Sequence, residues 1–245
     1  MFWKVLLHEG LFPCLECIVR QIGADILGMS PVGHPRINLV LYKITDAFYD
    51  SLHKVDTGGV IDLPEMEGRG RNYVGTPARA WKLIFKHLPI DPSLVTYVDF
   101  GCGKGRTLLL ASEMGFRRTI GVDISPQLLS VARQNMASRS VNGELVCCDV
   151  REFDFPNEPL VLFMYNPFYP DVMLRIAENL KASVRSQPRE VYVVYYSAPL
   201  RNVWRSLDFA VFRETDYAYP NYAIYHARSF DPVPAGERLP ISDTQ

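Results

Sequence analysis

The strongest constraint on the fold is an alternation of short apolar runs with amphipathic helical patterns, which extends from about residue 73 to about residue 230. The apolar runs are rich in β-branched and aromatic residues, as is typical of strands that are buried on both faces. Parallel neighbours need a long crossover connection, and the helical patterns supply it. The sequence therefore predicts a doubly wound α/β fold. The expected parallel strands are 95–100, 118–123, 144–149, 160–166 and 191–197.

The end of the chain breaks this alternation. Two further strand-like runs, 208–215 and 221–228, are joined by "DYAYP", which is too short to hold a crossover helix. They must therefore pair as an antiparallel hairpin. We expect a mostly parallel seven-stranded sheet that finishes in this C-terminal antiparallel hairpin.

The helices between the strands carry clear signals. Patterns over 104–115, 125–139 and 170–186 predict three of them. Ser125 is expected to cap the second helix, with Pro126 at its first position. Three segments follow along the chain: an N-terminal helical extension over 1–72, the α/β domain over 73–230, and a Pro-rich tail over 231–245.

Composition limits the classes of function. The 26 basic and 27 acidic residues give a net charge of −1, so the overall field offers no attraction to a polyanion, and a nucleic-acid partner is not expected. Cys14 and Cys17 have metal-ligand spacing but lack a second pair, so we expect no metal site. Adjacent Cys147 and Cys148 resemble small core residues. The N-terminal residues match a signal peptide poorly, and the sequence has no run of about 18 apolar residues. We therefore expect a cytoplasmic protein without a membrane span.

A glycine-rich turn follows the first strand of the α/β domain. "GCGKG" places Gly101, Gly103 and Gly105 where a doubly wound sheet binds its ligands, outside the carboxyl ends of the strands. Glycines there allow backbone conformations and close approaches that a Cβ would forbid. Asp123 and Asp149 end the second and third strands, so carboxylates stand beside the same turn. The pattern predicts a site for a nucleoside cofactor.

Asp99, two residues before the first of these glycines, helps to indicate which cofactor binds. A dinucleotide site prefers the spacing G-x-G-x-x-G, with a helix N-terminus facing a pyrophosphate. Here the glycines alternate, and an acid would repel a pyrophosphate but suits an ammonium group. The motif therefore favours a cationic nucleoside over NAD.

Four motifs in succession, "VDFGCGKGR", "GVDIS", "CCDV" and "YNPF", resemble those of class I S-adenosylmethionine-dependent methyltransferases over roughly residues 73 to 228. The resemblance implies that Asp99, Gly101 and Gly103 border the methionine part of the cofactor. It also implies that Asp123 holds the ribose hydroxyls and that Asp149 meets the adenine. The other cofactor-binding residues expected from it are Cys102, Ile124, Val150 and Asn166.

"YNPF" resembles the "[DN]PP[FY]" signature of amino-methylating members, and the lone asparagine also resembles the site of seven-strand protein lysine methyltransferases. The resemblance implies that Asn166 and the carbonyl of Pro167 accept hydrogen bonds from the substrate nitrogen, and that Phe168 packs on the substrate. Only one proline precedes Phe168, so the match is partial. The alternative is a loop that simply begins the next helix at Pro170.

Upstream of the first strand, "DTGG" (56–59) and "NYVGTP" (72–77) lie where bacterial relatives of this family have a cofactor-covering segment. Tyr73 is therefore a candidate lid residue, with an ordinary core residue as the alternative.

These observations predict an S-adenosylmethionine-dependent methyltransferase that acts on nitrogen, in a protein lysine or a small-molecule amine, without a metal. Two other classes stay open: a non-catalytic S-adenosylmethionine-binding protein and an NAD-dependent oxidoreductase. The latter would use the glycine turn and Asp123 but would have no use for Asp99 or Asn166.

Overall fold

The computed structural model describes residues 49–61, 73–215 and 220–230. The chain divides into two compact units, Met1–Lys54 and Val55–Gln245. In the first unit the described part is a short helical stretch at residues 49–53. Residues 1–48 and 62–72 of the N-terminal extension, which include Cys14 and Cys17, and the tail from residue 231 lie outside the described residues. Everything that follows concerns the second unit.

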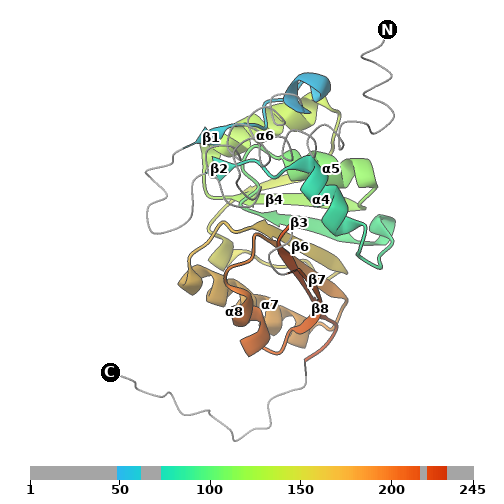
Figure 1. The fold of residues 1–245 in the computed structure, drawn as a ribbon, viewed down its shortest axis with the longest axis vertical. Coiled ribbons are helices and arrows are strands. Elements are labelled where there is room, and N and C mark those ends of the chain that lie inside the picture. The colour runs from blue at the N-terminus through green and yellow to red at the C-terminus, as the bar shows by residue number, and fades with distance from the viewer. Residues whose placement is uncertain (1–48, 62–72, 216–219, 231–245) are drawn as a thin grey trace, which may run out of the picture. The chain divides into compact units, whose positions relative to one another are not determined.

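The second unit contains a seven-stranded sheet in the order β5-β4-β3-β6-β7-β9-β8 (Figure 1). Strands β3 to β7 pair in parallel, and β9 is antiparallel to both of its neighbours. The prediction of a mostly parallel doubly wound sheet that finishes in an antiparallel hairpin is confirmed. The strands are β3 (Thr96–Phe100), β4 (Arg118–Asp123), β5 (Glu144–Cys147), β6 (Leu160–Tyr165), β7 (Val191–Tyr196), β8 (Ala210–Glu214) and β9 (Tyr222–Ala227).

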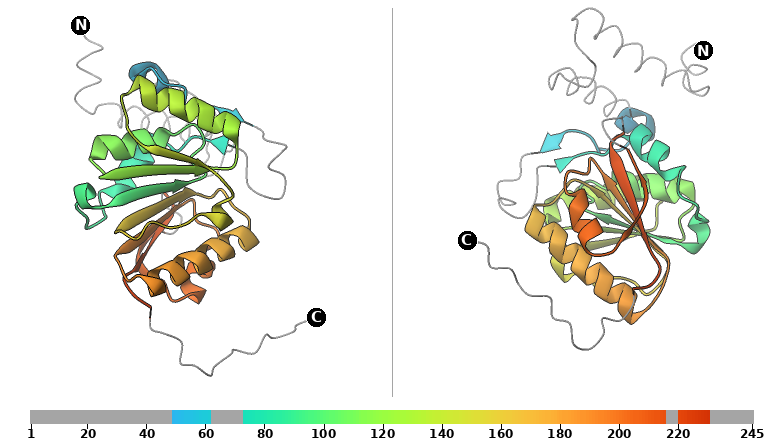
Figure 2. Two further views of the ribbon diagram at one scale, coloured as in Figure 1. Left: turned by 180° about the vertical axis from the view of Figure 1, so that it is seen from behind. Right: turned by 60° about the horizontal axis from the view of Figure 1, so that its bottom comes forward.

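Helices lie on both faces of this sheet, with α5 and α6 on one face and α7 with α8 on the other (Figure 2). Ser125 caps α6 by accepting a hydrogen bond from the Leu128 amide, and Pro126 is its first residue, as predicted. The helices are α4 (Ala78–Phe85), α5 (Arg106–Met114), α6 (Pro126–Ser138), α7 (Pro170–Ser186) and α8 (Arg201–Ser206), with 3-10 turns η2 (Pro92–Leu94) and η3 (Val150–Glu152).

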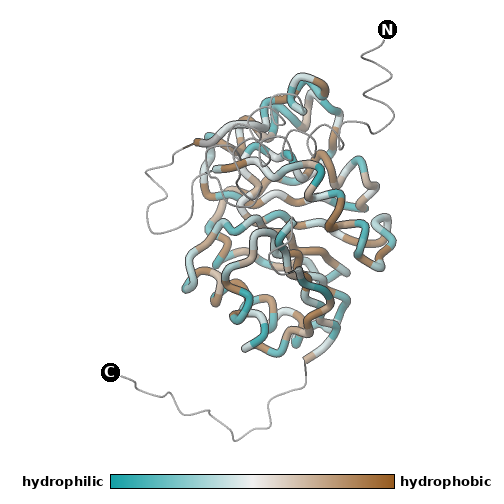
Figure 3. The backbone as a smooth tube through the Cα atoms, viewed as in Figure 1, coloured by the Kyte–Doolittle hydropathy of each residue, from teal (hydrophilic) through white to brown (hydrophobic). Residues whose placement is uncertain are grey.

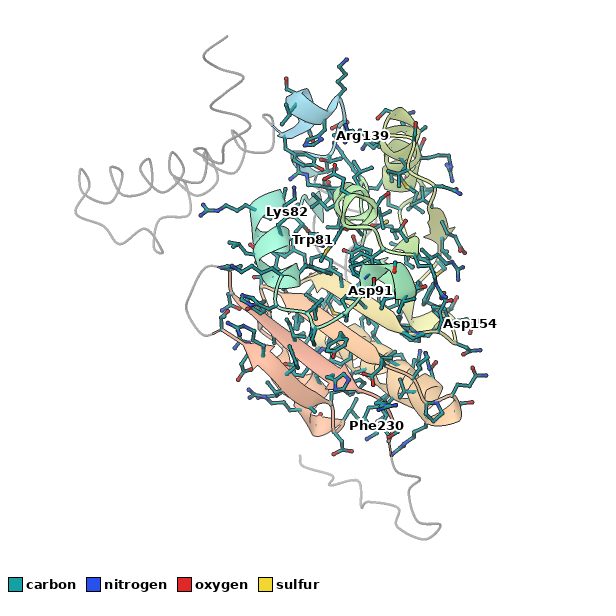
Figure 4. The ribbon with its side chains drawn as sticks, turned by 90° about the vertical axis from the view of Figure 1, so that its right-hand side faces the viewer. Trp81, Lys82, Asp91, Arg139, Asp154 and Phe230 are labelled. Atoms are coloured by element: carbon teal, nitrogen blue, oxygen red, sulfur yellow. The ribbon has the colours of Figure 1, made fainter. Side chains whose placement is uncertain are left out.

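The sheet is held between two apolar layers. On one face the strands pack against α7 and α8 through a large cluster of fully buried side chains, which includes Leu162, Ile176 and Trp204. On the other face Trp81 of α4 stacks on Phe85 with 3.9 Å between ring centroids. Trp81 points toward the sheet while Lys82 beside it points outward (Figure 4). Each buried large apolar side chain contributes about 1.5–3 kcal/mol, so these layers fix the strand ends in place.

Hydrophobic and hydrophilic residues alternate along the helices of this unit, as expected for helices with one buried side (Figure 3). Two elements give too little pattern to be predicted. One is a small antiparallel ribbon of β1 (Val60–Ile61) and β2 (Tyr73–Val74), and the other is α8, which is a helix of six residues. Strands of two residues show no periodicity.

Candidate functional site

The strand order reverses between β3 and β6, because chain-consecutive β4 lies on one side of β3 and β6 on the other. A crevice opens at the carboxyl ends of the strands at such a switch point, and ligands bind there. The glycine turn after β3 meets the loop after β6 at this point. A Cβ on Gly101 would lie 3.0 Å from the Cβ of Pro167. The structure thus brings the "GCGKG" and "YNPF" motifs together.

All three glycines of the turn have left-handed backbones, with φ values of 77° at Gly101, 52° at Gly103 and 82° at Gly105. Residues with a Cβ rarely adopt such values. The turn is also closely covered by protein. A Cβ on Gly103 would meet the ring of Tyr73 at 2.1 Å, and one on Gly105 would meet Ala132 of α6 at 3.1 Å. The sequence requires glycine at these positions for both conformation and packing.

Asp123 ends β4 beside this turn, with only 6% of its surface exposed. Its carboxylate accepts hydrogen bonds from the amides of Gly103 (2.8 Å) and Ser125 (2.9 Å). Burial raises the pKa of this carboxyl, and the backbone hydrogen bonds oppose that shift. A carboxylate offers about four acceptor positions, so the two oxygens keep capacity for the hydroxyls of a ligand. Ile124 follows directly and is half-buried.

Asp99 lies within β3 rather than on the turn, and its side chain is buried. Its carboxylate accepts a hydrogen bond from the hydroxyl of Thr107, at the start of α5. Burial raises the pKa of Asp99 to about 7; the Thr107 hydrogen bond opposes the shift and the charge of Asp123 adds to it. A cation nearby would favour the charged form of this acid. Cys102, on the turn, is also buried, and burial raises the pKa of its thiol well above the usual range.

Asp149 is not part of a strand, because β5 ends at Cys147, two residues short of the predicted 144–149. Asp149 instead caps η3, where it accepts hydrogen bonds from the Arg151 amide (2.9 Å) and the Arg151 guanidinium (2.6 Å). Val150 beside it is buried in the main core. The interpretation of the adjacent cysteines as core residues is wrong for Cys147, which is exposed at the end of the edge strand β5, and Cys148 is half-buried.

The "YNPF" motif carries the end of β6 into the loop before α7. Asn166 has a left-handed backbone with φ 39°, and its side-chain oxygen lies 3.4 Å from the hydroxyl of Tyr195, which donates to it. Pro167 faces Gly101. Phe168 is buried in the main core, and α7 begins at Pro170, as a plain connecting loop would also require.

Sequence reasoning missed a row of tyrosines next to Asn166. Tyr165 of β6 pairs with Tyr196 of β7, which pairs in turn with Tyr222 of β9. The first two rings lie with centroids 4.5 Å apart. Ser197, directly after β7, has a left-handed φ of 50° like that of Asn166. Strained backbones of this kind cluster at functional sites, and aromatic residues at two predicted strand ends were the available signal.

Tyr73, the candidate lid residue, lies in β2 with its ring against Gly103. It is buried in a small apolar cluster with Leu128 of α6, against which Ile61 of β1 also packs. The segment predicted to cover the cofactor therefore lies directly on the glycine turn.

Two further observations concern the described residues only. They contain no group of three or more His, Cys, Asp or Glu side chains that could hold a metal ion. None of their helices combines the length and apolar character that a membrane crossing requires.

Comparisons with known proteins agree with this fold. Residues 98–186 match the sequence family described as "Methyltransferase domain". The chain is 42% identical over 56 residues to the ribosomal protein L11 methyltransferase of Edwardsiella ictaluri, which is 23% of this chain and 19% of that protein. It is 45% identical over 48 residues to the protein of the same name from Thiobacillus denitrificans, which is 20% of this chain and 16% of that protein. The matched segment is thus about a fifth or less of each of these relatives.

Among solved structures, an RNA methyltransferase from Salinibacter ruber in complex with S-adenosyl-L-homocysteine matches with a TM-score of 0.47 and 24% identity, over 66% of this chain and 97% of that one. The family match covers the glycine turn, Asp123, Asp149 and Asn166. The buried acids Asp99 and Asp123, the glycine turn and the switch point suit a nucleoside cofactor. Residues 98–186 therefore match a methyltransferase domain, and they run from β3 to the end of α7 in the seven-stranded unit.

Proposed function

We propose that the chain is an S-adenosylmethionine-dependent methyltransferase that methylates an amine nitrogen, in a protein lysine or a small molecule. The observation that carries this proposal is the contact of the glycine turn with the loop of Asn166, at the switch point and beside Asp123. The cofactor would bring a methyl group on a sulfonium, so the protein itself has to bind, align and exclude water.

The residues that would hold the cofactor come from four strand ends. Asp123 accepts from the ribose hydroxyls, for which its two backbone hydrogen bonds orient it. The ammonium of the methionine part stabilises the charged form of buried Asp99. Tyr73 covers the site from the segment before α4. The remaining members are Gly101, Cys102 and Gly103 on the turn, Ile124 beside Asp123, and Asp149 with Val150 at the adenine.

Asn166 is the residue proposed to align the acceptor. Its left-handed backbone turns the chain at the end of β6, and Tyr195 steadies its side chain by donating to the amide oxygen. An amide oxygen has two lone pairs, so it can accept a second hydrogen bond from the substrate N–H. The carbonyl of Pro167 would accept in the same way. A lysine must lose its proton before it attacks, and burial beside a cation lowers its pKa from about 10.4.

Two alternatives are tested together with this proposal. An NAD-dependent oxidoreductase would place a pyrophosphate at the turn near Asp99, where the negative charges of the pyrophosphate and of the Asp99 carboxylate would repel each other. A non-catalytic binder would keep the cofactor site and lack turnover. The relatives named above are described as acting on a ribosomal protein and on RNA, so RNA is retained among the acceptors to be assayed.

The test uses the full chain, S-adenosylmethionine labelled in its methyl group, and a cell lysate separated into protein, RNA and small molecules. In the fraction that the wild type labels, we expect Asn166→Ala to reduce turnover by about 10² or more, the scale of losing a contact made in the transition state. Cofactor affinity should stay within a few fold. Asn157→Ala, in an exposed loop, is the matched control. No labelling by the wild type, or full turnover in Asn166→Ala, would contradict the catalytic role.

A further inference from the structure

Two cations are buried in and directly after the glycine turn. Lys104 is 7% exposed, and Arg106, the first residue of α5, is 2% exposed. Both positions are unfavourable for a cation, since burial removes its hydration and a helix N-terminus carries a positive partial charge. The hydrogen-bond partners of Lys104 and Arg106 must offset the cost of burying these charges. The identity of those partners indicates what the two residues do.

Arg106 joins the turn to both stretches of the covering segment. Its Nε donates to the hydroxyl of Thr57 at 2.6 Å, and its Nη1 donates to the carbonyl of Thr76 at 3.2 Å. Gly75 makes this approach possible, because a Cβ there would lie 2.6 Å from the Thr57 carbonyl oxygen and 3.2 Å from Nη1. Thr57 and Thr76 are thus both hydrogen-bonded to the guanidinium of Arg106.

Lys104 and Asn135 hold the residues on either side of Thr57. The Lys104 ammonium donates to the Asp56 carboxylate at 2.7 Å and to the Gly58 carbonyl at 3.1 Å. The Asn135 amide of α6 donates to the carbonyls of Asp56 (2.7 Å) and Lys104 (2.9 Å), and it accepts from the Asp56 amide (2.8 Å). A buried asparagine with these partners fixes the covering segment to both the turn and α6.

Thr57 is the link from this network to the candidate lid residue. The Tyr73 hydroxyl donates to the Thr57 carbonyl at 2.6 Å, while the Tyr73 ring lies against Gly103. The Lys104 ammonium lies 5.8 Å from the centroid of that ring. Thr57 therefore accepts a hydrogen bond from Arg106 on its side chain and one from Tyr73 on its backbone carbonyl. It is fully buried and connects these two residues.

We infer that Arg106 is a positioning residue, which acts through Thr57 to hold Tyr73 over the glycine turn and thereby sets the affinity for the cofactor. We call Asp56, Thr57, Lys104, Arg106 and Asn135 the covering clamp. The inference rests on the proposed function, since Tyr73 has a ligand to cover only if the turn binds one. It assigns a role to five residues that are not among the strand-end residues proposed to bind the cofactor.

The test compares two substitutions at Thr57 by calorimetric titration with S-adenosylhomocysteine. Thr57→Val keeps the shape but removes the hydroxyl that accepts from Arg106, whereas Thr57→Ser retains a hydroxyl. We expect about tenfold weaker binding for Thr57→Val, the scale of losing one hydrogen bond to a charged group, and near wild-type binding for Thr57→Ser. Melting temperatures measured on the same preparations report any general loss of stability.

A double-mutant cycle separates positioning from a merely structural role. If Thr57→Val acts through Tyr73, adding Tyr73→Ala should weaken binding by much less than Tyr73→Ala does alone. Should Thr57→Val fail to fold, Tyr73→Phe removes the other bond to Thr57 and keeps the ring, and it should weaken binding severalfold. Additive effects of Thr57→Val and Tyr73→Ala, or wild-type binding by Thr57→Val or Tyr73→Phe, would overturn the inference. A wild type that gives no binding heat overturns the proposed function and the inference with it.

Discussion

Replacing Asp123 by asparagine should separate cofactor binding from folding. Asn keeps the size of the side chain and one carbonyl oxygen, but it removes the charge and turns one acceptor into a donor. The two amides that point at this carboxylate, those of Gly103 and Ser125, then face one acceptor in place of two.

The magnitude follows from the surroundings of Asp123. Burial raises its pKa despite the two backbone hydrogen bonds, so the folded protein favours a neutral group at this position more than the unfolded chain does. Removing the buried charge therefore offsets much of the cost of the backbone hydrogen bond that the amide cannot accept. The free energy of unfolding should fall by about 1 kcal/mol or less, which is roughly 2–4 °C for a chain of this size. A ribose diol makes up to two charge-assisted hydrogen bonds, each about 1.5–3 kcal/mol, and neutral bonds are about half as strong. Loss of that difference weakens binding by about 10- to 100-fold.

The assay is calorimetric titration of wild type and Asp123→Asn with S-adenosylhomocysteine, together with thermal unfolding of both. Asp91→Asn is the matched control, because Asp91 also accepts a backbone hydrogen bond, from Ser93 at 3.0 Å, but it caps η2 before the start of β3, whereas the glycine turn follows the end of that strand. It should bind as the wild type does. Affinity of Asp123→Asn within twofold of wild type would refute the assignment of this acid to the ribose.

Two further outcomes test the surroundings of the turn. Burial raises the folded-state pKa of Asp99 from 3.8 to about 7, so its contribution to stability is present at low pH and is lost as pH rises through 7. In urea unfolding at pH 5 and pH 8, the wild type should therefore lose stability relative to Asp99→Asn. Equal changes in the stability of the two proteins between these pH values would contradict this expectation. Gly103→Ala and Gly115→Ala both force a left-handed alanine, at a cost of about 1–2 kcal/mol each, but only the first places a Cβ 2.1 Å from the Tyr73 ring. The melting temperature should therefore fall further for Gly103→Ala, and equal falls would show that Tyr73 does not lie on the turn.

The sheet and its helices were predictable because local pattern and tertiary environment agree along this part of the chain. Strands buried on both faces read as apolar runs, and α7 begins and ends where its pattern does, at Pro170 and Ser186, with Val172, Ile176 and Leu180 all buried. The antiparallel pairing of β8 with β9 was predictable because the connection between them is too short to hold a crossover helix. The meeting of Gly101 with Pro167 followed from topology, since both lie at carboxyl ends of neighbouring strands.

The rest depends on contacts that no local pattern records. The buried guanidinium of Arg106 finds its partners 49 and 30 residues earlier in the chain, at Thr57 and Thr76. The exposure of Cys147 depends on β5 being an edge strand, which is a property of strand order. The burial of Phe168 in the main core depends on how the loop after β6 meets α7. Each of these requires the tertiary fold.

The most direct test of S-adenosylmethionine binding at this sheet edge is titration of the purified full chain with S-adenosylmethionine and, separately, with NAD in a calorimeter. The alternating glycines, buried Asp99 and the strand-end carboxylate of Asp123 lead us to expect saturable binding of S-adenosylmethionine and no binding heat from NAD. Saturable binding of NAD without any response to S-adenosylmethionine would contradict the assignment of the cofactor.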